Sequence, residues 1–228
     1  MIRTAILIDG GFYRRRAYSL WGDKSAKDRA DELEQYCRRH LNNKKTKEDR
    51  YLYRIFYYDC PPFSRKIYHP FLQKQIDYAK TDLHTWMETF LSELKHKRKF
   101  ALRMGKLAEE QANYSIQYDK LKRLCNGTIT WNDLAEEDFV LNIKQKGVDM
   151  KIGVDIASLA YKKQVDQIIL ISGDSDFVPA SKLARREGID FILDPMQSHI
   201  KEDLYEHIDG IRTCYFKDKH SEKVSFEQ

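Results

Sequence analysis

The chain has 228 residues, of which 33% are charged, and its net charge is +5 at neutral pH. This length allows one α/β domain with a sizeable core. No stretch approaches the roughly eighteen apolar residues that cross a bilayer, and the first residues lack a signal-peptide pattern, which excludes membrane and secreted classes. We therefore expect a soluble, cytoplasmic protein with no membrane partner.

Five short runs rich in β-branched and aromatic residues predict strands. Four of them are almost continuously hydrophobic, which is typical of parallel strands that are covered on both faces. In chain order the predicted strands are Thr4–Ile8, Arg54–Tyr58, Phe100–Met104, Gln167–Ile171 and Asp190–Leu193.

Helical spacing of apolar residues alternates with these strands. The alternation favours an α/β fold with a central, mostly parallel sheet that is flanked by helices. Gly188 stands where a left-handed cap commonly ends a helix. The predicted helices are Ala26–Leu41, Phe71–Leu94, Met150–Lys163 and Pro179–Glu187.

The remaining segments suggest one domain over residues 1–215 and a polar C-terminal tail at 216–228. The charged stretch Asn42–Arg50 is predicted to be an exposed loop. Residues 107–145 have partly helical spacing and a turn at Asn126-Gly127, so we expect a helical excursion before the chain returns to the core. Four scattered cysteines without a CxxC pair suggest neither a zinc site nor a disulfide framework.

Aspartates follow several predicted strands directly. The carboxyl ends of parallel strands meet at one edge of a sheet, where ligands bind. Carboxylates gathered there repel one another unless a proton or a cation intervenes, and an all-oxygen ligand set favours Mg²⁺ or Mn²⁺ over zinc. Such an ion suits hydrolysis of a phosphodiester. The aspartates are Asp9, Asp59, Asp174, Asp176 and Asp194.

A lone aspartate after a strand is more often a helix N-cap or a turn residue than a ligand. Asp59 and Asp194 each stand near prolines, so we treat both as turn residues. Asp174 and Asp176 are different, because a cap needs only one of two carboxylates on the same loop. We therefore place these two in the candidate site together with Asp9.

The segment from Lys146 to Asp155 adds two more carboxylates. Asp149 caps the next helix if that helix begins near Met150, and from there it can also face the crevice. Asp155 lies about 240° further around the helix, so the two residues do not line one site equally. We prefer Asp149 as the residue that lines the site. Asp155 is expected either to hold a site residue in position without contacting the ligand or to form an ion pair with Lys151.

Three separated blocks, IDGG, QKGVDMKIGVDIA and ILISGDSDFVPASKLARREG, resemble the NYN domain and, within it, the LabA-like branch. The segments RIFYYDCPP and LRMG are also similar, so the resemblance covers nearly the whole chain. It implies a PIN-like Rossmannoid fold, a Mg²⁺ or Mn²⁺ site and ribonuclease activity. The family's site carboxylates then correspond to Asp9, Asp149, Asp174 and Asp176. Many NYN proteins carry Asn three residues after the first aspartate, where this sequence has Phe12.

On this hypothesis the four carboxylates hold the metal and act catalytically, with Ser172, Asp155 and Lys146 supporting them. Basic residues would steer a nucleic acid, RNA rather than DNA, although any single basic cluster is more often the solvated face of a helix. A homodimer is left open. The expected nucleic-acid contacts are Arg14, Arg15, Arg16 and Lys151, and basic residues also cluster at Lys95–Lys99 and Arg185-Arg186.

Two other classes of function compete with this hypothesis. A nucleic-acid-binding or regulatory protein would keep the fold and the acidic pocket without turnover. A phosphatase or nucleotide-binding enzyme is disfavoured, because Gly11 stands where one phosphatase family needs a second aspartate. The chain also has no GxGxxG or GxxxxGK[ST] phosphate loop.

Overall fold

Six parallel strands form the central sheet in the computed structural model, which describes residues 1–42 and 49–214. Their order across the sheet is β12-β11-β10-β1-β2-β5, so the α/β prediction is confirmed. All five predicted strands are present, and β12 was not predicted. The strands are β1 (Ile2–Asp9), β2 (Arg50–Asp59), β5 (Phe100–Met104), β10 (Gln167–Ile171), β11 (Asp190–Asp194) and β12 (Gly210–Ile211).

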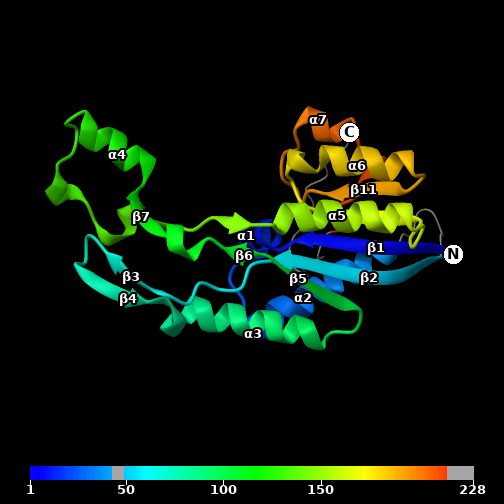
Figure 1. Cartoon of the computed structure of the whole chain (residues 1–228), viewed down its shortest axis with the longest axis horizontal. Helices are drawn as coiled ribbons and strands as arrows, with labels where there is room; N and C mark the ends of the chain where they lie inside the picture. The colour runs from blue at the N-terminus through cyan, green and yellow to red at the C-terminus, as the bar shows by residue number, and fades with distance from the viewer. Residues whose placement is uncertain (43–48, 215–228) are drawn as a thin grey trace, which may run out of the picture.

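Helices cover both faces of the sheet (Figure 1). The predicted helix Ala26–Leu41 is confirmed residue for residue, and a helix directly after β1 was not predicted. Gly188 has the expected left-handed conformation, with φ 82°. One face carries α1 (Gly10–Trp21), α2 (Ala26–Leu41) and α3 (Asp82–His96), and the other carries α5 (Val148–Tyr161), α6 (Val178–Arg186) and the short α7 (Glu202–Tyr205).

Alternate residues of β1 point into two separate cores. Ala5 and Leu7 pack with α5 and α6, whereas Ile6 and Ile8 pack with α1, α2 and α3. All four side chains are fully buried. This two-sided burial explains why β1 is hydrophobic without interruption.

The predicted helix Phe71–Leu94 is wrong over its first part. Lys74–Asp77 forms strand β4, which pairs with β3 (Lys66–His69) across a turn where Gln73 has φ 51°. Helix α3 begins only at Asp82, because the side chain of Thr81 caps it by accepting a hydrogen bond from the backbone N–H of His84 at 3.2 Å. Apolar spacing in the β3–β4 hairpin resembled a helical pattern.

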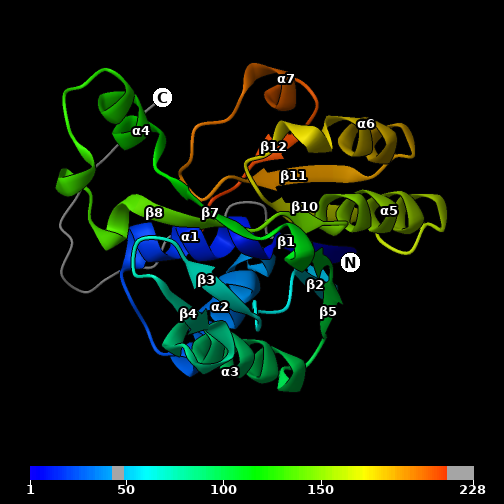
Figure 2. The same ribbon diagram turned by 60° about the vertical axis from the view of Figure 1, so that its left-hand side comes forward.

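Residues 106–146 form an arm that projects beyond the carboxyl ends of the strands (Figure 1). Figure 2 brings this arm forward, with α4 at its far end. The expected excursion is present, but it is only partly helical, because two antiparallel pairs, β6–β9 and β7–β8, hold it together. Its elements are β6 (Lys106–Leu107), η2 (Glu109–Gln111), β7 (Asn113–Ile116), α4 (Tyr118–Cys125), η3 (Trp131–Asp133), η4 (Glu136–Asp138), β8 (Phe139–Asn142) and β9 (Gln145–Lys146).

Two sequence predictions concern residues outside the described part of the chain. The predicted polar tail at 216–228 lies wholly outside it, and the predicted loop lies outside it at residues 43–48. Within the described part of the chain, no helix is long and apolar enough to cross a membrane. All four cysteines are free thiols.

A buried polar network closes the end of β11. The carboxylate of Asp194 accepts a hydrogen bond from the Tyr36 hydroxyl at 2.5 Å and lies 2.8 Å from Nε2 of His40. Its other oxygen accepts from the backbone N–H of Met196 at 2.8 Å and from the Thr213 hydroxyl at 2.9 Å. Asp194 therefore holds the turn after β11 against α2, as expected for a residue outside the candidate site.

His40 makes the stability of the fold depend on pH. Burial lowers its pKa, but the hydrogen bond and the charge of Asp194 raise it, and the net value is about 9. Because the folded pKa lies above the unfolded value of 6.5, the stabilisation is complete below pH 6.5 and is lost as the pH rises through 9. We predict a loss on the order of 3 kcal/mol in the free energy of unfolding across this range.

Denaturant unfolding of the intact chain between pH 6 and pH 9.5 measures this loss. His40→Gln removes the titrating group, so the variant should show a much flatter dependence than the wild type. Parallel curves for the two proteins would contradict the assignment to His40.

Candidate active site

The C-terminal ends of β1 and β10 lie side by side at the edge from which the arm projects. Their register pairs Ile8 with Ile171, so Asp9 and Ser172 follow next to each other. The Ser172 hydroxyl donates to Oδ2 of Asp9 at 3.4 Å and accepts from the backbone N–H of Asp174 at 3.3 Å. Buried Ser172 thereby links the two strand ends, which agrees with its expected supporting place.

Asp9 also caps helix α1. Its Oδ1 accepts the backbone N–H of Phe12 at 3.0 Å. Burial raises the pKa of Asp9, and the charge of Asp174 adds to the rise, whereas the Phe12 N–H, Arg15 and Ser172 oppose it. Asp9 therefore combines the ordinary role of a strand-end aspartate with a place in an acidic cluster.

The loop after β10 carries two carboxylates that differ in their hydrogen bonding. Asp174 caps the short turn η5 (Ser175–Phe177) by accepting the backbone N–H of Asp176 at 3.0 Å. Asp176 is exposed, and its carboxylate has no hydrogen bond or ion pair within residues 1–42 and 49–214. The cap thus uses only one of the two carboxylates, as the spacing predicted. Buried Phe177 anchors the loop.

Asp149 lies in the first turn of α5, so its predicted role as the N-cap is wrong. Helix α5 begins at Val148, and the cap position is Gly147 with φ 80°. Burial raises the pKa of Asp149, and the charges of Asp9, Asp174 and Asp176 raise it further. The fold therefore brings all four predicted carboxylates within electrostatic reach of one another. We call Asp9, Asp149, Asp174 and Asp176 the acidic cluster.

Asp155 does not join the acidic cluster. Its Oδ2 accepts the Tyr58 hydroxyl at 2.8 Å and pairs with Nε of Arg103 at 3.2 Å. The predicted alternative, an ion pair with Lys151, is wrong because the end of β5 places Arg103 against this side of α5. Lys151 is exposed on α5, and Lys146 is exposed in β9 opposite Lys106.

The three arginines of α1 have different environments. Arg14 forms an ion pair with buried Asp59 and donates to the Tyr57 hydroxyl at 3.2 Å. Arg16 donates to the carbonyl of Met196 at 2.8 and 3.1 Å. Arg15 is exposed, and in the described part of the chain its guanidinium has no hydrogen bond or ion pair. Arg15 is therefore the one of the three that is available to a ligand.

One residue of each of the other basic clusters forms ion pairs within the fold. Lys97 pairs with Asp31 and Glu34, and Arg185 pairs with Asp209 at 2.8 Å. These ion pairs agree with the interpretation that Lys97 and Arg185 belong to solvated helix faces and do not contact a nucleic acid.

Gln145 contributes to the site and was not predicted. A Cβ built on Gly11 would lie 3.6 Å from Oδ1 of Asp9, 3.7 Å from Nη1 of Arg15 and 3.9 Å from Oε1 of Gln145. An acid, a base and an amide thus surround the first turn of α1. The position of Gln145, just before the Lys146-Gly147-Val148-Asp149 block, was the only signal in the sequence.

The donor set of the acidic cluster fits a hard divalent cation in chemistry. All its ligands are oxygens, and the pKa values of Asp9 and Asp149 are raised, first by burial and then by neighbouring carboxylates, as in a site that awaits positive charge. Across the residues that the structure describes, however, no three acidic, His or Cys side chains are close enough together to hold an ion. The acidic cluster therefore concentrates negative charge, but its side chains are not arranged as a complete set of metal ligands.

Comparisons with known proteins identify the family of the chain. The family model of the NYN domain matches residues 73–207, more than half of the chain. The chain belongs to the NYN domain family. This family lies within the PIN-like nuclease superfamily, so a nuclease type of hydrolase is the class to which the domain belongs. Asp149, Asp174 and Asp176 lie inside the matched range, and the sheet adds Asp9 from outside it.

One similar solved structure is that of a protein of unknown function from Vibrio parahaemolyticus. It is 13% identical, with a TM-score of 0.44, and the match covers 92% of this chain and 91% of that one. The comparison with curated proteins gave no match. The LabA-like branch stays a prediction.

Phe12 has a packing role in this NYN domain. A Cβ on Gly173 would lie 2.8 Å from Cε2 of Phe12, so the ring covers the backbone of the loop that carries Asp174 and Asp176. The aromatic residue at this position therefore presses the loop against α1, where many family members have Asn.

Gly10 is required by a close approach at the end of β1. A Cβ there would lie 2.5 Å from Cζ of Tyr57 and 2.6 Å from Oδ2 of Asp59. The Tyr57 hydroxyl donates to that carboxylate at 2.9 Å. Burial raises the pKa of Tyr57 to about 12, although Arg14 opposes the rise, so the hydroxyl keeps its proton at neutral pH.

Neighbouring glycines give a matched test of this packing. Gly10→Ala should destabilise the protein by about 1–3 kcal/mol, because buried Tyr57 has to move. Gly11→Ala meets only ordinary contacts and removes a helical glycine, so its stability should be unchanged or higher by up to about 1 kcal/mol. Thermal unfolding measures both, and equal effects would contradict the close approach at Gly10.

The raised pKa of Asp149 predicts a stabilising substitution. Because the folded pKa exceeds the unfolded value of 3.8, the ionised carboxylate destabilises the fold at neutral pH, and this penalty vanishes below the unfolded value. Asp149→Asn should raise the free energy of unfolding at pH 7 by up to about 1 kcal/mol, given solvent screening. The gain should disappear near pH 3.

This measurement needs a chelator, so that no bound cation offsets the repulsion. Asp203→Asn, on exposed α7, is the control and should change little at either pH. A variant Asp149→Asn no more stable than the wild type at pH 7 would show that the carboxylates do not repel.

Proposed function

We propose that the chain is a metal-dependent nuclease that hydrolyses phosphodiester bonds, with RNA as its main substrate. The observation that carries this proposal is the convergence of Asp9, Asp149, Asp174 and Asp176 at one edge of the sheet, where burial and then the charges of the other three carboxylates raise the pKa of Asp149. Four carboxylates from three segments converge although their charges oppose folding. Such a cost is typical of a functional site.

The acidic cluster would hold Mg²⁺ or Mn²⁺. Asp149 and Asp176 support this assignment because neither carboxylate is bound by another group in the described residues, so both can turn toward a cation. When bound, such an ion activates water and neutralises the charge that develops on the phosphoryl oxygens.

The residues around the acidic cluster would bind and orient the substrate. Arg15 has no ion-pair partner among the described residues, lies beside Asp9 and suits a phosphate oxygen. Ser172 orients Asp9, and the amide of Gln145 can hydrogen-bond the sugar-phosphate backbone. Lys146 and Lys151 remain candidates for longer-range steering in a cytoplasmic enzyme.

An RNA-binding or regulatory protein with little turnover is the second candidate. It is favoured by Phe12, which packs on Gly173 instead of offering a polar side chain to the site. It is also favoured by the absence of three ligands at metal-binding distance among the described residues.

A cleavage assay over single- and double-stranded RNA and DNA separates the two candidates. We predict cleavage with Mn²⁺ or Mg²⁺, none in EDTA, and a loss of at least about 100-fold in Asp174→Asn, because even outer-shell partners of a metal are worth about 10- to 100-fold. Asp203→Asn should retain full activity. Cleavage that persists in EDTA would overturn the metal-dependent proposal, and RNA binding without cleavage would favour the second candidate.

A further inference from the structure

We propose that the pocket between α1 and α3 binds a nucleobase of the strand whose phosphate lies at the acidic cluster. This inference rests on the proposed function and extends it to a base-binding subsite. The pocket has a volume of about 500 Å³. It is lined by Arg14, Arg15, Tyr18, Asp23, Arg29, Asp82, Leu83, Trp86 and Met87.

The pocket adjoins the acidic cluster through helix α1. Arg15 lines the pocket, and its guanidinium also lies near Asp9, because a Cβ built on Gly11 would be 3.7 Å from Nη1 of Arg15 and 3.6 Å from Oδ1 of Asp9. Tyr18 follows Arg15 by three residues, so the two side chains share one face of the helix. A phosphate at Arg15 would therefore place the attached nucleoside near Tyr18.

The side chains at the mouth are apolar and unusually exposed. Tyr18 of α1 is 64% exposed and Leu83 of α3 is 69% exposed, and both line the pocket. Trp86 and Met87 lie on the same face of α3 as Leu83. Aromatic and apolar walls of this kind stack on the flat faces of bases. A base in a duplex is already stacked, so the pocket suits an unpaired base.

The charges around the pocket favour a neutral group inside it. Arg14 and Arg29 are neutralised by Asp59 and Glu32, so they offer little to an anion. Asp23 and Asp82 would repel a phosphate from the pocket, although their oxygens can accept hydrogen bonds from the amino groups of a base. Among the arginines that line the pocket, Arg15 alone has no carboxylate partner within residues 1–42 and 49–214, and it lies beside Asp9 of the acidic cluster.

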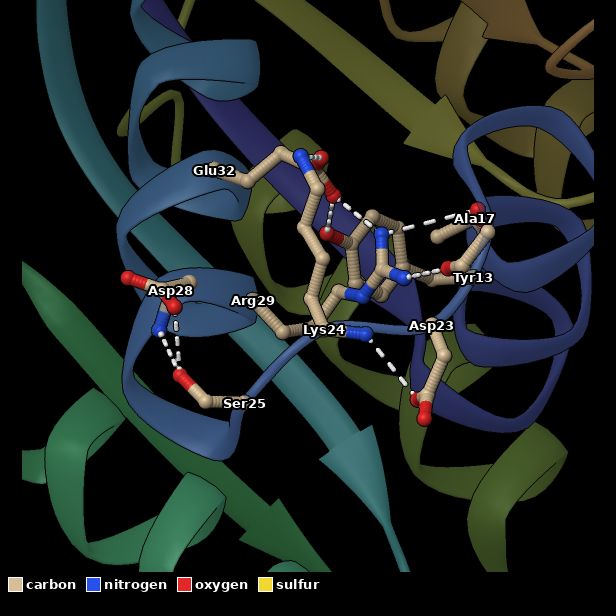
Figure 3. A network of polar contacts seen from close by, with 9 residues as sticks. Tyr13, Ala17, Asp23, Lys24, Ser25, Asp28, Arg29 and Glu32 are labelled. Atoms are coloured by element: carbon tan, nitrogen blue, oxygen red, sulfur yellow. Dashed lines mark hydrogen bonds and ion pairs between the residues drawn. The ribbon is translucent and has the colours of Figure 1, made fainter.

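A buried polar network holds the walls of the pocket in place (Figure 3). Arg29 donates to the carbonyl of Gly22 and pairs with Glu32, which also accepts from the Tyr13 hydroxyl at 3.4 Å. Trp86 donates to the carbonyl of Lys24 at 2.9 Å. The connection from α1 to α2 is thereby fixed against α3, so the pocket exists before a base enters.

A second pocket of about 360 Å³ continues the first toward the arm. It shares Arg14, Leu83 and Met87 with the first pocket and reaches Gln145. The two pockets therefore form one groove that includes Arg15 and Gln145, which both lie beside Asp9 at the first turn of α1. This continuity fits a strand of several nucleotides better than a small apolar ligand.

Binding of fluorescein-labelled single-stranded RNA to the full chain tests the proposal by anisotropy, in an Asp174→Asn background that does not cleave the probe. Tyr18→Ala should weaken binding about 5- to 100-fold, the range for loss of one stacked base. Tyr18→Phe should bind like the parent. Tyr161→Ala is the matched control, because Tyr161 is a comparably exposed tyrosine on α5.

An RNA with one abasic nucleotide makes the test specific. At the position that occupies the pocket, the abasic probe should bind more weakly to the parent, and Tyr18→Ala should then cost nothing further. Equal binding of single-stranded RNA by the parent and Tyr18→Ala would overturn the subsite. So would a Tyr18-dependent dimer in sedimentation, since a second copy of the chain would then cover this face.

The binding assay is independent of turnover. Metal-dependent cleavage combined with no effect of Tyr18→Ala leaves the proposed function intact and rejects the subsite. An effect of Tyr18→Ala on binding without any cleavage by the wild type rejects the nuclease and keeps the base pocket.

Discussion

Repulsion between carboxylates at one edge of the sheet is the constraint on which the site depends. The ends of β1 and β10 fix Asp9 beside Ser172, and the first turn of α5 adds Asp149. The fold tolerates this concentration because helix α1 and the turn η5 each use one carboxylate as a cap. Hydrogen bonds from backbone N–H groups to these carboxylates thereby offset part of the free energy that the repulsion costs.

Much of the sheet could be predicted because its strands are buried on both faces. Continuous hydrophobicity identified β1 and β10, and the aspartates after them marked the edge where the site lies. The β3–β4 hairpin could not be predicted, because apolar residues of its second half continue the helical spacing of α3 and its strands are only four residues long. The pairing of residues 106–107 with 145–146 was also hidden, because it joins segments far apart in the sequence.

Individual roles in the site depend on partners that sequence does not reveal. Arg14, Arg15 and Arg16 are consecutive and identical in type, yet only Arg15 faces the acidic cluster without a partner in the described chain. Asp149 and Asp155 share one helix, but Arg103 of β5 draws Asp155 away. Such differences arise from packing between elements, and the order of residues alone does not contain them.

Asp9 has two roles, because its carboxylate caps α1 and also belongs to the acidic cluster. Asparagine caps a helix about as well as aspartate but carries no charge. Asp9→Asn would therefore remove one charge from the acidic cluster while α1 keeps its cap. Under the proposed function, loss of catalysis at this position is thus separable from loss of the fold.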